Sequence, residues 1–138
     1  MKVLLSIRPE YAVEIFRGSK LFEYRRVPPR RQSVRTAAVY VTRPVSQIVG
    51  EFYFNEIIYG NPDDIWRQTS KYSGISYDFF KEYFRNRQVA YALSIKKAVL
   101  YERPVDPYTL FGGFTAPQSY MYLEDGFLAG AEQLQLAF

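Results

Sequence analysis

The sequence contains neither cysteine nor histidine. Without cysteine no disulfide framework can form, so nothing argues for an oxidising compartment. Zinc sites built from thiolates or imidazoles are excluded, and so are Ser-His-Asp and Cys-His nucleophiles. Any acid–base chemistry must therefore come from Glu, Asp, Lys, Tyr or Arg side chains, and we expect no metal and no cofactor.

The sequence also lacks a hydrophobic run of membrane-spanning length. Its apolar start, MKVLLSI, is ended at strand length by Arg8 and Pro9, and no stretch approaches the ~20 apolar residues that a membrane span needs. We therefore expect a cytoplasmic protein without a membrane partner. The 138 residues are 48% hydrophobic and 23% charged, which is enough for one folded domain with one sizeable core.

Positive charge is concentrated in the first third of the chain. Residues 1–50 hold ten of the eighteen Lys and Arg residues but only three of the fourteen acidic ones. Such an asymmetry favours an anionic partner that meets one face of the molecule. A basic surface that is merely solvated explains the same pattern equally well.

The hydrophobic periodicity predicts a mixed α+β domain. Apolar runs and alternating patterns indicate strands over residues 2–7, 20–26, 36–42, 48–58 and 89–101, and Gly50 suggests a bulge or a close approach. Helices are expected from Pro9 to Gly18, after Asn61, after Gly74 and from Glu124 onward. Five or six strands in so short a chain favour a curved or closed mixed sheet over a doubly wound one.

One segment has a charge pattern that suits a site. Residues 18–26, GSKLFEYRR, have the form G-x-K-x-x-E-x-R. Glu23 and Arg25 share one face of the predicted strand because side chains alternate with a period of two. Lys20 joins them only if it lies in the turn before a regular strand. Such an acid between two bases is costly unless the charges are paired or face a cleft.

This motif resembles the signature of the ASCH family, in the PUA-like superfamily. The resemblance continues at residues 6–12, 42–44, 48–51, 72–75 and 117–120. It implies a PUA-like curved β-barrel of five to six mixed strands with flanking helices, over residues 1–123. Residues 124–138 would be a C-terminal helix or tail packed on the same domain.

The resemblance also implies a function. It favours RNA or nucleotide binding in a basic cleft beside the motif strand, single-stranded more than duplex, with a regulatory role such as transcriptional control. The alternative is a hydrolase in which Lys20 and Glu23 are catalytic. This would be a ribonuclease, or an amidohydrolase acting on acetylated cytidine. Members of the amidohydrolase type carry Thr where this chain has Glu23, so the chain departs from that pattern.

Residue chemistry assigns roles within such a cleft. Arginine suits bidentate phosphate contacts, a buried lysine suits a base, and glutamate accepts from a cytosine amine. Tyrosine rings can stack on bases. The same groups could instead brace the fold through ion pairs and core packing. The predicted binding residues are Ser6, Arg8, Lys20, Glu23, Arg25, Arg26, Thr42, Arg43, Gln118, Ser119 and Tyr120.

The last six residues, QLQLAF, carry a second signal. They resemble the peptide with which bacterial replication and repair proteins dock onto the sliding clamp. Leu136 and Phe138 would fill an apolar pocket there, next to Leu134, and Gln133 would make orienting hydrogen bonds. The alternative is a terminal helix that packs on the domain.

Overall fold

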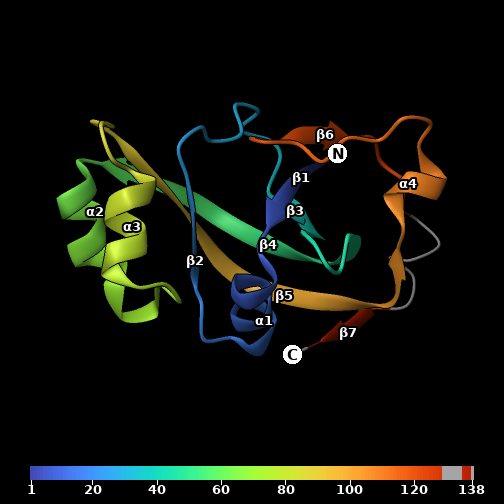
Figure 1. Ribbon diagram of the computed structural model, residues 1–138, viewed down its shortest axis with the longest axis horizontal. Coiled ribbons are helices and arrows are strands. Elements are labelled where there is room, and N and C mark those ends of the chain that lie inside the picture. The colour runs from blue at the N-terminus through green and yellow to red at the C-terminus, as the bar shows by residue number, and fades with distance from the viewer. Residues whose placement is uncertain (129–134, 138) are drawn as a thin grey trace.

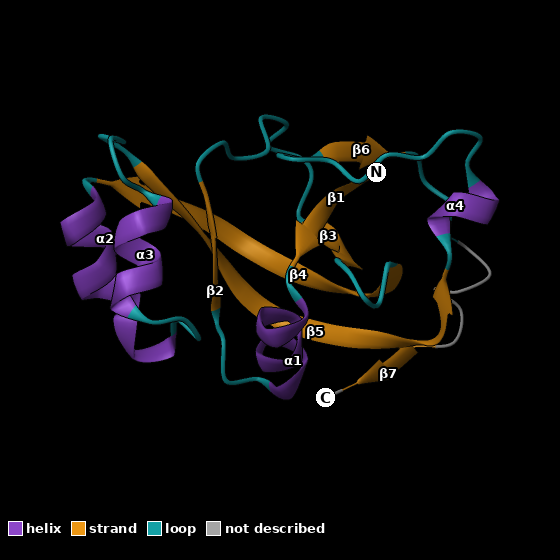
Figure 2. Cartoon of the chain, in the orientation of Figure 1, coloured by secondary structure: helices purple, strands orange, loops and turns teal. Residues whose placement is uncertain are grey.

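The computed structural model describes residues 1–128 and 135–137 (Figure 1). Residues 1–60 hold four strands and one helix, and one long strand dominates the second half of the chain (Figure 2). In chain order the elements are β1 (Lys2–Ile7), α1 (Pro9–Arg17), β2 (Phe22–Arg25), β3 (Thr36–Val41), β4 (Gln47–Gly60), α2 (Pro62–Thr69), the 3-10 helix η1 (Ser70–Tyr72), α3 (Tyr77–Tyr83), β5 (Ala90–Val105), α4 (Pro107–Leu110), β6 (Met121–Leu123) and β7 (Gln135–Ala137).

The described strands form one mixed sheet. Its order is β2-β5-β4-β3-β1-β6, with β7 added beside β5. Strands β1 and β3 run parallel, and the other neighbours run antiparallel. The sheet curls, because Arg25 of β2 reaches the Ser6 carbonyl of β1 although three strands separate β2 from β1 in the sheet order. The predicted α+β fold with a curved mixed sheet and flanking helices is confirmed.

Gly50 allows the two longest strands to approach closely. A Cβ at this position would lie 2.4 Å from the Val99 carbonyl oxygen and 2.9 Å from Cε1 of Phe16. The register of β4 against β5 also shifts between Ile48 and Gly50. The structure therefore confirms both a bulge and a close approach at this glycine, and helix α1 packs against it.

Three apolar clusters make up the core, and alternation along the strands decides which cluster a side chain joins. Val3, Leu5 and Ile7 of β1 point to one side and pack with α1. Leu4, on the other side, packs with residues of β3, β4 and β5. A third cluster fixes the helices α2 and α3, which Figure 1 shows together at one end of the molecule. Tyr24 of β2 belongs to this third cluster, so the motif strand is held against those helices.

The structure differs from the sequence-based expectations at the motif strand and at the C-terminus, and it adds α4 and β6, which were not expected. Strand β2 begins at Phe22 rather than Lys20, which leaves Lys20 in the turn after α1. The helix expected from Glu124 is wrong in the described residues, since 125–128 form turns and Gln135–Ala137 form β7. Gly126 takes a φ of +82°, which ends helical geometry, and the long edge of β5 offers main-chain partners to β7. No helix in the described part of the chain has the length and apolarity to cross a membrane.

Candidate functional site

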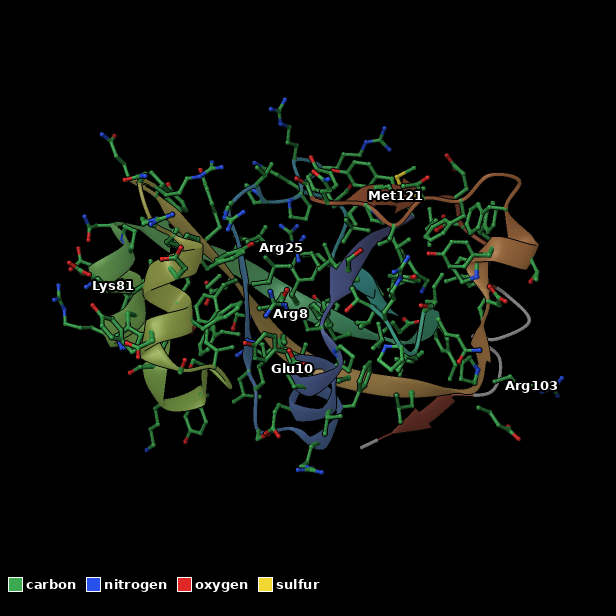
Figure 3. All side chains as sticks on the ribbon, in the orientation of Figure 1. Arg8, Glu10, Arg25, Lys81, Arg103 and Met121 are labelled. Carbon is green, nitrogen blue, oxygen red and sulfur yellow. The ribbon has the colours of Figure 1, made fainter. Side chains whose placement is uncertain are left out.

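A cavity of about 490 Å³ opens between β1 and β2, where the curled sheet is not closed by main-chain pairing in the described residues. The start of α1, helix α3 and residues 118–119 complete its walls. Figure 3 shows Arg8 and Arg25 in the middle of the molecule, near the gap between these two strands. We call this cavity the cleft. Its charged and aromatic lining residues are Arg8, Lys20, Arg25, Arg26, Arg87, Glu23, Tyr11, Tyr24, Phe79 and Tyr83.

A buried cluster of three charges forms the base of the cleft. Glu23 accepts a hydrogen bond from Arg25 through Oε2, at 3.1 Å, and its Oε1 lies 4.0 Å from Nζ of Lys20. The exposed fractions are 1% for Lys20, 7% for Glu23 and 6% for Arg25. Side chains alternate along β2, so Glu23 and Arg25 lie on the same face of the strand. Lys20 precedes the strand, and the turn after α1 brings its ammonium to the same carboxylate.

Lys20 is held from several sides. Its ammonium donates to the Ser73 carbonyl at 2.6 Å and lies 4.9 Å from the centre of the Tyr24 ring. The aliphatic part of the side chain is pressed against Gly74, where a Cβ would meet Lys20 Cβ at 2.6 Å. Burial lowers the Lys20 pKa to about 8, and the Glu23 carboxylate opposes this shift only in part. Near neutral pH a fraction of this amine is therefore uncharged and able to accept a proton.

Besides pairing with the Glu23 carboxylate, Arg25 donates hydrogen bonds to backbone carbonyl groups in the wall of the cleft. Its guanidinium donates to the Ser6 carbonyl at 3.4 Å and to the Ser119 carbonyl. The Ser6 hydroxyl in turn donates to the Pro117 carbonyl at 2.8 Å. These bonds tie the segment around residue 118 to β1 and β2, so Ser6 and Ser119 position the wall of the cleft.

Two arginines at the opening pack over aromatic rings. Arg8 lies over the Phe79 ring at 5.2 Å, and Arg26 lies over the Tyr83 ring at 4.2 Å. Burial raises the pKa of the Tyr83 hydroxyl. Arg8, Arg26 and Arg87 are exposed, and we call them the rim arginines. They are placed for contacts with anions at the opening, while the rings offer flat apolar faces further in.

Tyr24 contributes its ring but not its hydroxyl. The hydroxyl is hydrogen-bonded to Thr69 of α2 at 2.6 Å. Burial raises the Tyr24 pKa to about 12. The ring makes edge contacts with Phe80 and Phe84. The Tyr24 ring therefore packs against Lys20. The half-buried rings in the walls of the cleft are the surfaces on which a ligand can stack.

The structure brings eight of the eleven predicted binding residues to the cleft. Thr42, Arg43 and Tyr120 are not among its lining residues. The Thr42 amide donates to the Ile7 carbonyl, Arg43 is exposed, and Tyr120 packs against the core beside Tyr122. The eight that line the cleft are Ser6, Arg8, Lys20, Glu23, Arg25, Arg26, Gln118 and Ser119.

Sequence reasoning did not assign Tyr11, Phe79, Tyr83 or Arg87 to the site, although all four line the cleft. Phe79 and Tyr83 are four residues apart, so they share a helix face next to that of the buried Phe80. This second aromatic row on a short helix was the available signal. No pattern in the sequence connects Arg87 with the motif strand.

The C-terminal peptide was the second predicted binding segment. Gln133, Leu134 and Phe138 of the C-terminal peptide fall outside the described residues, and the backbone of Leu136 pairs with Leu100 in the β5–β7 ladder. Across residues 1–128 and 135–137, no group of three His, Cys, Asp or Glu residues gathers where a metal ion could bind.

Comparison with known proteins gives a consistent picture. A model of the ASCH domain family matches residues 5–99. The chain is 27% identical over 128 residues to an ASCH domain-containing ribonuclease of Zymomonas mobilis, with 88% of this chain and 84% of that protein covered. It is 32% identical over 126 residues to a large ribosomal subunit protein uL22 of Ureaplasma parvum, but spans only 39% of that relative's length.

Solved structures agree on the fold. The crystal structure of ASCH from Zymomonas mobilis superposes with a TM-score of 0.84 at 25% identity, and the match covers 99% of this chain and 96% of that one. A serine-to-alanine mutant of the same Zymomonas mobilis protein gives 0.84 at 24% identity, with 97% of this chain and 96% of that one covered. The family match extends over more than half of the chain and includes the second half of β1, the motif strand and most of β5. This chain belongs to the ASCH domain family.

Proposed function

We propose that this chain binds single-stranded RNA by taking one nucleotide into the cleft. The observation that carries the proposal is the composition of the cleft, in which five basic residues and four aromatic rings surround a single carboxylate. Its volume of about 490 Å³ lies in the range of small-ligand sites. The half-buried rings of Tyr11, Phe79 and Tyr83 suit stacking on a base, and arginines at an opening hold phosphates.

The depth of the cleft favours an unpaired base. A base in a duplex keeps its polar edge inside the stack, so it cannot reach the buried Glu23. An inserted base would meet a carboxylate that accepts N–H donors, such as the amino group of cytosine. The rim arginines would hold the adjoining phosphates. The Zymomonas mobilis relative that is named a ribonuclease supports RNA as the partner.

A salt titration tests the proposal. Binding of a short single-stranded RNA would be compared with binding of the matched DNA and RNA duplex. The wild type would be set against Arg8→Ala/Arg87→Ala, with Lys81→Ala/Arg103→Ala as the control of equal charge change. Figure 3 places Lys81 and Arg103 toward opposite ends of the molecule, away from Arg8.

We expect tight, salt-sensitive binding that prefers single-stranded RNA, weakened about tenfold by the loss of two rim arginines and unchanged in the control. Equal binding by both variants would show that the RNA lies elsewhere. Binding without turnover would leave a regulatory module as the function of the domain.

Hydrolysis of the bound RNA is a second candidate, which the environment of Lys20 favours. A neutral Lys20 amine would take the proton from the ribose 2′-hydroxyl. The 2′ oxygen would then bond to phosphorus as the bond to the 5′ oxygen breaks, and that oxygen would leave with a proton from water. Arg25 and the rim arginines would stabilise the charge that develops on the phosphate.

The pH profile and one substitution test this second candidate. Cleavage should rise about tenfold per pH unit below 8 and level off above it, because only the neutral amine accepts a proton. Lys20→Met should abolish cleavage while RNA remains bound. Unchanged cleavage by Lys20→Met would identify a contaminating nuclease. Acetate release from N4-acetylcytidine, without RNA cleavage, would instead indicate the amidohydrolase alternative.

A further inference from the structure

We propose that the loop formed by residues 26–35, between β2 and β3, is a phosphate track for the RNA strand that leaves the cleft. The inference rests on the proposed function, because it assigns a path to nucleotides next to the one in the cleft. Arg26 lies at the rim of the cleft, and Arg30, Arg31 and Arg35 follow within nine residues. Figure 1 shows this loop rising from the end of β2 and passing beside β6.

The loop is held in one shape. Both the Arg30 and the Arg31 amides donate to the Tyr122 hydroxyl of β6, at 3.1 and 3.0 Å. Pro28 and Pro29 restrict the backbone just before this contact. Ordering the loop therefore costs little when a ligand binds, and this preorganisation favours affinity.

Arg31 of the loop packs on a tyrosine ring, as Arg26 does at the rim of the cleft. Arg31 lies over the Tyr122 ring at 4.5 Å, as Arg26 lies over the Tyr83 ring at 4.2 Å. A guanidinium stacked on a ring is oriented but keeps N–H groups for a phosphate. Arg30 and Arg31 are both exposed, so their outer faces are open to a strand of RNA.

Their charge is also uncompensated within the described residues. No carboxylate there forms an ion pair with Arg26, Arg30 or Arg31, whereas Arg67 pairs with Asp64 on α2 and Arg85 pairs with Glu82 at the end of α3. Near the loop, Asp125 is already paired with the amino terminus of Met1. A row of unpaired cations that starts at the cleft is suited to the backbone of a single strand.

The test compares two RNA lengths. Affinities would be measured over a range of salt for an eight-nucleotide single-stranded RNA and for a dinucleotide with the same central sequence. The proteins are the wild type, Arg30→Ala/Arg31→Ala, and the control Lys81→Ala/Arg103→Ala. Melting temperatures establish that each variant is folded.

We expect Arg30→Ala/Arg31→Ala to bind the octamer about tenfold more weakly, with a salt slope reduced by about 1.4, and to bind the dinucleotide as the wild type does. An unchanged octamer affinity and slope would overturn the track, and so would an equal loss for both ligands. A wild type that binds neither RNA would overturn the proposed function itself. Wild-type binding of both RNAs with an unaffected double variant would overturn the track alone.

Discussion

At the scale of single residues, the burial of Lys20 is energetically costly. A lysine that is 1% exposed loses nearly all of its hydration, and one carboxylate at 4.0 Å does not restore it. The Ser73 carbonyl and the face of the Tyr24 ring stabilise the ammonium in part. A group whose protonation is disfavoured by folding makes stability depend on pH.

The sign of that dependence follows from the Lys20 pKa, about 8 when folded against an ordinary 10.5. Below pH 8 both states hold the proton, and the folded state carries the full cost, roughly 3 kcal/mol. Between pH 8 and 10.5 the unfolded state holds more protons, so the free energy of unfolding rises with pH. Urea unfolding of wild type and Lys20→Met should show the wild type gaining relative to the variant across this window. Parallel pH curves would contradict the lowered pKa.

Gly74 gives the second prediction at this scale. Gly74→Ala must both strain a φ of +67° and displace Lys20, whose side-chain carbons would lie 2.6–2.9 Å from the new Cβ. Gly113→Ala is the matched control, since φ is +69° and nothing lies within 4 Å. Thermal unfolding should show a loss of about 1 kcal/mol for the control and at least twice that for Gly74→Ala. RNA binding should fall only for Gly74→Ala. Equal losses in both variants would show that Lys20 moves aside freely.

At the scale of elements, the N-terminal cap of helix α3 helps to hold a wall of the cleft in place. The Ser76 hydroxyl accepts a hydrogen bond from the Phe79 amide at 3.1 Å. The Arg8 guanidinium lies over the Phe79 ring. The carboxamide oxygen of Asn61 caps α2 in the same way through the Asp63 amide at 2.9 Å. Helix α2 contributes no residue to the cleft, so the two caps form a natural pair for comparison.

Ser76→Ala and Asn61→Ala should each cost about 1 kcal/mol of unfolding free energy. Only Ser76→Ala should also weaken RNA binding, because it loosens the first turn of α3 and with it the ring under Arg8. Denaturant unfolding and RNA titration of the two variants would check both parts. If Asn61→Ala weakened binding equally, the effect would come from global stability.

The same elements show what the sequence could and could not reveal. Caps at Asn61 and Gly18 and the apolar pattern of β1 act over a few residues, so they were predicted correctly. The C-terminal strand β7 was not, because its partner β5 lies far earlier in the chain. For the site, the charges of β2 were found from their spacing. Arg87 was missed because only the packing of α3 on β2 brings it to the cleft.

At the scale of the whole molecule, the cleft occupies a seam between β1 and β2 that the described strands leave unpaired. Strand β6 covers only Lys2–Leu4 on the outer edge of β1, so residues 5–7 face β2 without a ladder. Arg25 crosses this gap and bonds to carbonyl groups of Ser6 and Ser119. In a closed barrel, main-chain hydrogen bonds join the first and last strands. Here side-chain hydrogen bonds join β1 and β2 instead, and they leave an opening for a ligand.

A double-mutant cycle measures how far this crossing holds the fold. Arg25→Met leaves Glu23 buried beside Lys20 alone and deprives the Ser6 and Ser119 carbonyls of a donor, so we expect a loss of about 3–5 kcal/mol. Glu23→Gln should cost less, because the carbonyl bonds of Arg25 remain. The double variant should be more stable than the sum of the single losses by about 1–3 kcal/mol, measured by urea unfolding. Additive losses would mean that the carboxylate and the guanidinium act separately, and that the carbonyl bonds of Arg25 alone close the seam.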